Sequence, residues 1–252
     1  MIRRTFLLTS AASLGCLASG TAWAEEVTVD MLLRGLEKNL NADARTSTNT
    51  MTVSNGRRVR EYVMKGYGRG IDESAIEFLA PARDKGTKML RKGDDMWLYM
   101  PSVERTQKIS GHMLRQGMMG SDMSYEDITG STDWAEVYTG TIIGIEQVDG
   151  RDHHRVELVA KSDDITYAKR VLWIDVETMI PTRQELYALS GLLVKAWEMS
   201  DVQETDGHKY PMKMRIEDKL KTGSYTEIHT TEISFDVALP EEVFSMRWIE
   251  RG

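Results

Sequence analysis

The chain is almost devoid of cysteine: a single one, Cys16, occurs in 252 residues. It falls in an N-terminal segment that we expect to be removed, so the mature protein would contain no thiol. A cysteine nucleophile and a disulfide framework are then excluded, even in an oxidising compartment. The hydrophobic core alone must hold the fold together, and a chain of this length buries enough surface for that.

Residue patterns typical of catalysis are also lacking. No histidine stands in an H-x-H or H-E-x-x-H spacing, and the sequence has no G-x-S-x-G elbow, P-loop or G-x-G-x-x-G. The acidic pairs at 94–95, 163–164 and 241–242 stand at predicted turns or at a helix start, where carboxylates are usually solvated. A glycosidase-type carboxylate pair stays open among 39 acidic residues, but no pattern points to one. We expect no enzyme, no metal site and no cofactor.

Basic residues are the minority charge. The chain has 32 Lys and Arg against 39 Asp and Glu, a net charge of −7, and loss of Arg3 and Arg4 would lower it by two more. A net-acidic surface argues against nucleic acid and against a general hold on anionic lipid headgroups, although it leaves room for a local contact.

Residues 1–24 have the layout of a secretory signal peptide. Arg3 and Arg4 precede an apolar stretch, and Ala22-Trp23-Ala24 is a small-residue exit that predicts cleavage before Glu25. The stretch is short and rich in Ser, Thr and Gly, which disfavours an uncleaved membrane anchor. The arginine pair also fits a twin-arginine signal, so Sec and twin-arginine export both stay open. A lipoprotein signal ending at Cys16 fits less well, because Ser13 stands where such signals favour Leu.

The rest of the chain, 25–252, is predicted to be one domain that works in the periplasm. Apolar residues recur at helical spacing from 30 to 39 behind Asp30, which predicts a helix with Asp30 as its N-cap. Beyond Ala44 short extended runs alternate with turns such as Asn55-Gly56, a pattern typical of an antiparallel meander. The predicted strands are 46–53, 58–68, 74–80, 87–91, 95–100, 105–109, 137–148, 153–161, 166–175, 182–189, 192–203, 210–220 and 225–235. A helical turn at 240–245 and a last short strand, Met246–Glu250, are predicted to follow.

Alternation along these runs predicts one polar and one apolar face of the sheet, as in Met212 to Glu217. The run 96–100 is apolar on both faces, so something must cover each side of it. An open sheet of about ten strands has to close or be covered, and there is too little helix to cover it fully. The expected fold is therefore mainly β: a large curved antiparallel sheet, or half-open β-barrel, plugged by short helices over a hollow apolar interior.

The most distinctive segment is 86–128. It reads GTKMLRKGDDMWLYMPSVERTQKI over 86–109 and MGSDMSYEDI over 119–128. This segment resembles the bacterial outer-membrane lipoprotein-sorting proteins of the LolA-like superfamily, whose pattern is KGT…WLYLP…R…G…MGSDFSYEDL. Met123 stands where Phe is common in that pattern.

The resemblance implies a half-open β-barrel with a helical lid that carries acyl chains of lipoproteins, or other lipids, between the inner and outer membranes. It further implies an inner-membrane transporter of ABC or RND type as donor, an outer-membrane acceptor, and a monomer. The alternative is an accessory or sensor domain that docks on an inner-membrane transporter without transferring cargo. An empty apolar cavity favours the carrier, and an interior packed at core density favours the accessory domain.

The candidate ligand-binding site consists of methionines in the segment 111–124 together with Met89 and three aromatic residues. Four methionines crowd a glycine-containing segment at 111–124, where flexible, polarisable side chains suit a variable apolar ligand. We interpret this segment as a gate; a fixed plug over the barrel mouth is the alternative. Ser124, with Asp127 three residues on, predicts the start of a helix. The full predicted site consists of Met89, Trp97, Tyr99, Met113, Met118, Met119, Met123 and Trp173.

We expect the exported protein to begin at Glu25. The small-residue exit before Glu25 matches the signal-peptidase pattern better than the residues before Cys16 do. Intact-mass spectrometry of the protein from a periplasmic extract checks this, and an acyl chain on Cys16 would contradict it.

Overall fold

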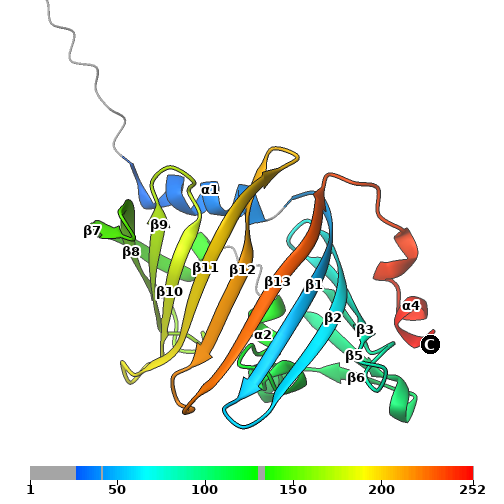
Figure 1. Ribbon diagram of the computed structural model, residues 1–252. Coiled ribbons are helices and arrows are strands. Elements are labelled where there is room, and N and C mark those ends of the chain that lie inside the picture. The colour runs from blue at the N-terminus through cyan, green and yellow to red at the C-terminus, as the bar shows by residue number, and fades with distance from the viewer. Residues whose placement is uncertain (1–26, 41, 130–133, 252) are drawn as a thin grey trace, which may run out of the picture.

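The computed structural model describes residues 27–40, 42–129 and 134–251; the predicted cleavage site lies outside these ranges. Thirteen antiparallel strands form one curved sheet with the order β6-β5-β4-β3-β2-β1-β13-β12-β11-β10-β9-β8-β7 (Figure 1). The strands are β1 (Ala44–Asn55), β2 (Val59–Arg69), β3 (Glu73–Ala80), β4 (Lys88–Lys92), β5 (Asp95–Met100), β6 (Arg105–Ile109), β7 (Tyr138–Val148), β8 (Arg151–Ala160), β9 (Lys169–Asp175), β10 (Pro181–Tyr187), β11 (Leu193–Thr205), β12 (His208–Asp218) and β13 (Ser224–Phe235).

Each strand pairs with the strand that follows it in the sequence, except β6, which does not pair with β7. In addition the first strand, β1, pairs with the last, β13, so that Met51 lies opposite Ile228. This pairing joins the two halves of the meander in the middle of the sheet. It also places β6 and β7, which follow one another in the chain, at opposite edges. The connection between them, 110–137, therefore has to run from one edge of the sheet to the other.

The helical elements are short and few. They are α1 (Val29–Leu40), α2 (Tyr125–Thr129), α3 (Trp134–Val137), α4 (Met246–Glu250) and the 3-10 turns η1 (Pro101–Val103), η2 (Gly111–Arg115), η3 (Met118–Gly120) and η4 (Glu241–Phe244). In the described part of the chain no helix has the length and apolarity needed to cross a membrane.

Helix α1 covers one half of the concave face, which we call the inner face (Figure 1). Leu32 and Leu33 are buried there against strands β7, β8 and β9. At Gly140 a Cβ would lie 2.4 Å from Val29 Cγ1, so only glycine lets the helix approach β7 this closely. The Thr28 hydroxyl accepts from the Met31 amide at 3.2 Å, so the cap lies two residues before the predicted Asp30. Asp30 instead pairs with Arg34.

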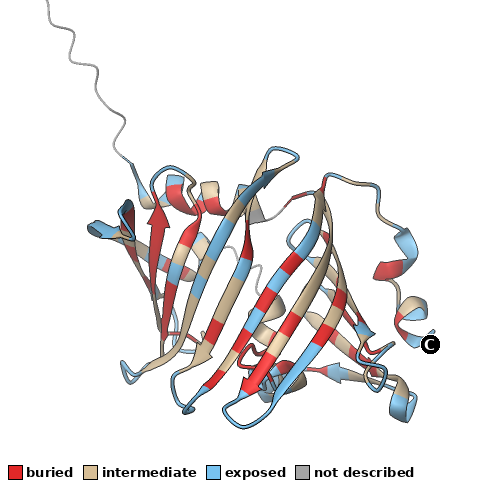
Figure 2. Ribbon diagram, in the orientation of Figure 1, coloured by how far each residue is buried: buried red, intermediate tan, exposed pale blue. Residues whose placement is uncertain are grey.

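The segment that follows β6 covers the other half of the inner face. Figure 2 shows buried residues alternating with less buried ones along β13, β1 and β2. The buried set of one face, including Met51, Tyr62 and Phe78, packs against Met118, Met123 and Tyr125 from the 111–129 segment. The polar face of the same strands lies outside, as the alternation predicted.

The C-terminal segment covers part of the outer face. Val243, Phe244 and Ile249 pack on Leu90 and Tyr99, which point away from the inner face. Strand β5 is thus apolar on both faces because each face is covered: Met96 and Leu98 meet the inner cluster, while Trp97 and Tyr99 meet the C-terminal segment.

The predicted strand Met246–Glu250 is wrong, because these residues form helix α4. The Ser245 hydroxyl caps this helix by accepting from the Trp248 amide at 3.1 Å. The segment lies on the face of the sheet, where it packs on side chains of β4 and β5. The preceding turn at 240–245 is confirmed as η4. The other predictions of fold class are confirmed: the protein is mainly β, with an open antiparallel sheet and few helices.

Replacing Phe244 by Ala should lower the free energy of unfolding by about 3–5 kcal/mol, since it empties a buried aromatic site. Phe244 is only 1% exposed, and the Arg69 guanidinium lies over its ring at 4.5 Å. Urea unfolding measures the change, with the exposed Val103→Ala as a control that should change little. A loss in Phe244→Ala no larger than in the control would show that the C-terminal segment does not stabilise the sheet.

Candidate functional site

A short, firmly held loop on the inner face leads into helix α2. The Met118 amide donates to the Met123 carbonyl at 2.8 Å. The Asp122 amide donates to the Thr226 hydroxyl on β13 at 2.9 Å, and Lys221 pairs with the Asp122 carboxylate at 3.1 Å. These bonds fasten residues 118–123 to the sheet.

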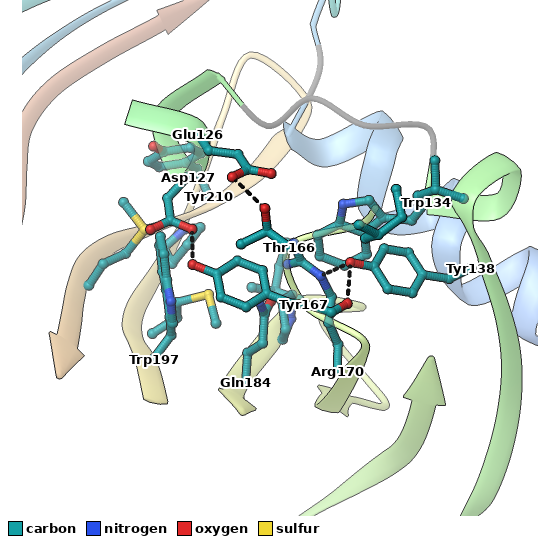
Figure 3. Close-up of a pocket in the computed structure, with 17 residues that line it drawn as sticks. Glu126, Asp127, Trp134, Tyr138, Thr166, Tyr167, Arg170, Gln184, Trp197 and Tyr210 are labelled. Atoms are coloured by element: carbon teal, nitrogen blue, oxygen red, sulfur yellow. Dashed lines mark hydrogen bonds between the residues drawn. The ribbon is translucent and has the colours of Figure 1, made fainter. Parts of the chain in front are cut away.

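Helix α2 begins at the predicted cap. The Ser124 amide donates to Asp127 Oδ2 at 2.8 Å, and the Asp127 amide donates to the Ser124 hydroxyl at 3.1 Å. This reciprocal arrangement is a capping box in which Asp takes the place of the usual Glu or Gln. It turns Glu126 toward Thr166 and Asp127 toward Tyr167, as Figure 3 shows.

Asp127 is the centre of a buried polar network. Its carboxylate forms an ion pair with Lys195 of β11 and accepts a hydrogen bond from the Tyr167 hydroxyl at 2.9 Å. Beside it Glu126 accepts from the Thr166 hydroxyl at 2.7 Å. Burial first, and then the Asp127 carboxylate, raise the pKa of Tyr167 well above its ordinary value, so its hydroxyl remains a donor. Helix α2 is therefore tied both to strand β11 and to the segment that precedes β9.

One cavity, of about 230 Å³, lies between α2, α3 and the strands β9 to β12 (Figure 3). Five aromatic residues are part of its wall: Trp134, Tyr138, Tyr167, Trp197 and Tyr210. The Arg170 guanidinium lies 5.1–5.3 Å from the ring centres of Trp134, Tyr138 and Tyr167, and its Nε donates to the Tyr138 hydroxyl at 2.9 Å. This arginine lies against the electron-rich faces of three rings, a favourable cation–π arrangement. The rest of the wall combines apolar side chains with a few polar ones, among them Glu126, Asp127 and Gln184.

A second cavity, of about 300 Å³, lies on the other side of α2, against β1, β2 and β3. Methionines of the sheet and of the loop line its deep part, and Arg45 and Arg91 line its rim. Four residues belong to the walls of both cavities: Asp127, Trp197, Tyr210 and Met214. Helix α2 thus divides one hollow interior into two neighbouring chambers. We call them the α3 chamber, of about 230 Å³, and the β1–β3 chamber, of about 300 Å³.

A further hollow, of about 1040 Å³, is lined by charged side chains of the outer face. Those charges neutralise one another: Lys213 pairs with Asp201 at 3.4 Å, and Arg215 pairs with Glu227 at 2.6 Å. Small-molecule sites are usually apolar with a few converging polar groups, which describes the inner chambers better.

Comparison with known proteins agrees with this geometry. A family model described as an uncharacterised protein matches residues 70–251. A DUF1329 family protein from Desulfovibrio piger superposes with a TM-score of 0.81 at 29% identity, covering 86% of this chain and 96% of that one. The chain belongs to the LolA-like family.

Two further structures share the fold of this LolA-like protein. An outer membrane lipoprotein-sorting protein domain from Vibrio parahaemolyticus superposes with a TM-score of 0.78 at 23% identity, covering 86% of this chain and 96% of its own. A LolA superfamily protein from Nitrosomonas europaea superposes with a TM-score of 0.74 at 24% identity, covering 88% and 99%. A search of curated proteins finds no match.

Five of the predicted site residues lie on the inner face of this LolA-like protein. Met118 and Met123 line the β1–β3 chamber, and Met89 is buried in the same cluster. Met113 and Met119 pack against that cluster while remaining half-buried. Their contact with a ligand stays a prediction.

The three predicted aromatic residues lie elsewhere. Trp97 and Tyr99 pack against the C-terminal segment on the outer face. Trp173 is sandwiched on the outer side of β9 between the guanidinium groups of Arg155 and Arg183, at 5.3 and 4.8 Å. None of the three lines either chamber. A binding role for them also stays a prediction, but the structure places them in outer-face packing.

The aromatic and charged residues of the α3 chamber escaped the sequence analysis. One signal was present: Lys195, Trp197 and Met199 alternate along β11, so a lysine shares the face of two apolar residues. A charge on an inner face needs a partner, yet the sequence does not reveal that Asp127, 68 positions away, supplies it.

Replacing Lys195 by Met should destabilise this LolA-like protein by about 3 kcal/mol, because the carboxylate of Asp127 would stay buried without its cation. The side chains of Lys195 and Asp127 are 13% and 4% exposed. The double variant Lys195→Met/Asp127→Asn should recover part of the loss. Urea unfolding of the natural protein, the two single variants and the double variant gives the coupling energy. The more exposed ion pair between Lys219 and Glu217 provides the control, because Lys219→Met should cost under about 1 kcal/mol. Equal losses in Lys195→Met and Lys219→Met would contradict a buried tie.

Proposed function

We propose that the protein is a periplasmic carrier that holds acyl chains of lipoproteins or other lipids in its inner chambers and moves them between the two membranes. The observation that carries the proposal is the pair of chambers on either side of α2, which share Trp197 and Met214 as a common wall. Likeness to the lipoprotein-sorting protein domain from Vibrio parahaemolyticus supports the same class of cargo.

The energetics of such a cargo match the lining. Each methylene group that leaves water contributes about 0.8 kcal/mol, so a long acyl chain gains much from a modest apolar cavity. Met64, Met118, Met123 and Met214 all line the β1–β3 chamber. Thioether side chains adapt to irregular ligands at little cost, so chains of different length and saturation would be accepted.

The loop over the chambers has two parts with different roles. Residues 118–123 are bonded to β13 and behave as a plug. Residues 111–116 form turns, such as the Gln116 amide to the Met113 carbonyl at 3.0 Å, and the Gln107 side chain on β6 makes a long contact of 3.6 Å to the Met113 sulfur. They are the part suited to a gate. Hydrogen exchange with and without lipid tests this division, because a gate gains protection when cargo is bound.

The transfer partners follow from the same proposal. Cargo would come from an inner-membrane transporter of ABC or RND type and pass to an outer-membrane acceptor, with the carrier acting as a monomer. An accessory domain that only docks on the transporter would be expected to have a filled interior, so the two chambers support the carrier instead.

Mass spectrometry of the protein purified from its own periplasm should detect a co-purifying lipid with at least one acyl chain. Equilibrium binding of a fluorescent acyl probe gives the matched quantitative test. Met214→Trp enlarges a side chain of the wall common to both chambers, and it should weaken probe binding at least about 10-fold, or 1.4 kcal/mol.

The control is Leu189→Trp, which adds the same ring at a residue that is 71% exposed and should leave binding unchanged. Thermal melting confirms that both variants are folded. Undiminished binding in a folded Met214→Trp variant, together with the absence of lipid in the native preparation, would refute the carrier.

A further inference from the structure

The rim of the β1–β3 chamber contains an ordered row of residues. The strand register places Arg45 opposite Gly68, Gly68 opposite Ser74, and Ser74 opposite Arg91. These four residues therefore lie side by side across β1, β2, β3 and β4. Arg91 shares its face with Met89, two positions earlier and inside the inner cluster, so the row belongs to the inner face.

Both arginine side chains extend from their own strands toward β2. A Cβ built on Gly68 would lie 2.8 Å from Arg45 Nε and 3.1 Å from its Cγ, so the Arg45 side chain lies across β2, in the direction of β3 and β4. Nη1 of Arg91 donates to the Ile71 carbonyl in the β2–β3 turn at 2.7 Å. With strands about 4.8 Å apart, the two backbones are separated by three strand spacings, which two side chains of this length can bridge from opposite sides.

Polarity falls in steps from this rim to the interior. The next inward-facing row across the same strands is Ser47, Gly66, Ile76 and Met89, and the row after it includes Asn49, Met64 and Phe78. Each step is about 7 Å along the strands. The chamber thus runs from two guanidinium groups, past small and polar side chains, to the methionines beside α2. That gradient matches an amphiphile with a charged head and an apolar chain.

Two carboxylates near the rim are themselves held by other cations. Glu73 is held by Arg69 at 2.6 Å and Lys92 at 3.2 Å. Asp127, deeper in the chamber, is paired with Lys195.

The carboxylates that act on Arg91 itself, Asp72 and Asp94, stand in exposed turns. Burial lowers the pKa of Arg91, and the attraction of these two carboxylates only partly opposes that effect. An anion inside the chamber would therefore stabilise the charged guanidinium.

We propose that Arg45 and Arg91 bind the anionic headgroup, a carboxylate or a phosphate, of a lipid whose acyl chain occupies the β1–β3 chamber. Planar guanidinium groups suit both headgroups, because each can donate two parallel hydrogen bonds to a pair of oxygens. This inference rests on the proposed carrier function and adds to it a preference among lipids. The chain as a whole is net acidic, so the preference comes from two placed residues and not from the overall charge.

The test compares ligands that differ only in the headgroup. Hexadecanoate, hexadecyl phosphate and hexadecanol, each below its aggregation limit, displace a fluorescent acyl probe from the full mature chain. The natural protein should bind at least one of the two anions 10-fold or more tightly than the alcohol. The anion that gains more identifies the source as a fatty acid or a phospholipid. The preference should shrink as salt is raised.

The variants separate this inference from the carrier function. In Arg45→Gln/Arg91→Gln the preference should fall to less than 3-fold, while binding of hexadecanol stays within 2-fold of the natural protein. Arg83→Gln removes an exposed arginine in the β3–β4 connection and should keep the full preference. If the double variant does not fold, Arg91→Lys is the alternative. It keeps the positive charge but cannot donate two parallel hydrogen bonds from one planar group, so a reduced preference for the anions over hexadecanol supports the same role.

Three results would overturn the inference. Equal binding of all three ligands by the natural protein, or a preference that survives in the folded double variant, refutes the headgroup site and leaves the carrier in place. Failure of every ligand to bind, the alcohol included, refutes the carrier and the headgroup site together.

Discussion

The pairing of β1 with β13 is the constraint on which the rest of the structure depends. It joins the start and the end of the meander in mid-sheet and sends β6 and β7 to opposite edges. Because those two strands are consecutive in the chain, the residues between them must cross the open side of the sheet. The covering of the inner face is therefore built into the strand order and needs no separate domain.

This covering is only partial, and the hollow interior follows from that. Helix α1 fills the half of the inner face over β7 to β9, whereas the segment after β6 fills the half over β1 to β5. The short helix α2 stands between them and is too small to occupy the space on both of its sides. Glycines at 66 and 68 widen the space beside β1, since side chains there would collide with Ser47 and Arg45. Two chambers remain where a longer helix would have produced a solid core.

The position of α2 depends on polar contacts more than on apolar area. A buried ion pair such as Asp127–Lys195 adds little net stability, because desolvation offsets most of the attraction. The ion pair instead fixes the orientation of α2, because the Asp127 carboxylate reaches both of its partners only when α2 faces β11 and the Tyr167 hydroxyl. A plug held in this way keeps a defined orientation while leaving the apolar chambers beside it unfilled, which is the combination that a lipid-binding cavity requires.

The local structure was determined by the sequence alone. Hairpin turns such as Asn55-Gly56, the alternation along β12 and the Ser124 cap are set by neighbouring residues, so the strands, the fold class and the start of α2 could all be predicted.

The strand predicted at Met246–Glu250 failed because short apolar runs are ambiguous until their contacts are known: on the face of the sheet, with Ser245 as a cap, a helix is the better solution. The positions of Trp97, Tyr99 and Trp173, which do not line either chamber, could not be predicted for a similar reason. Alternation separates the two faces of β5, but it does not tell which face will be hollow. That was decided by tertiary structure, when the C-terminal segment covered Trp97 and Tyr99 and the loop after β6 left space beside Met118 and Trp197. The partners of Lys195 and the row from Arg45 to Arg91 likewise come from strand pairings between distant parts of the chain, which no local pattern in the sequence encodes.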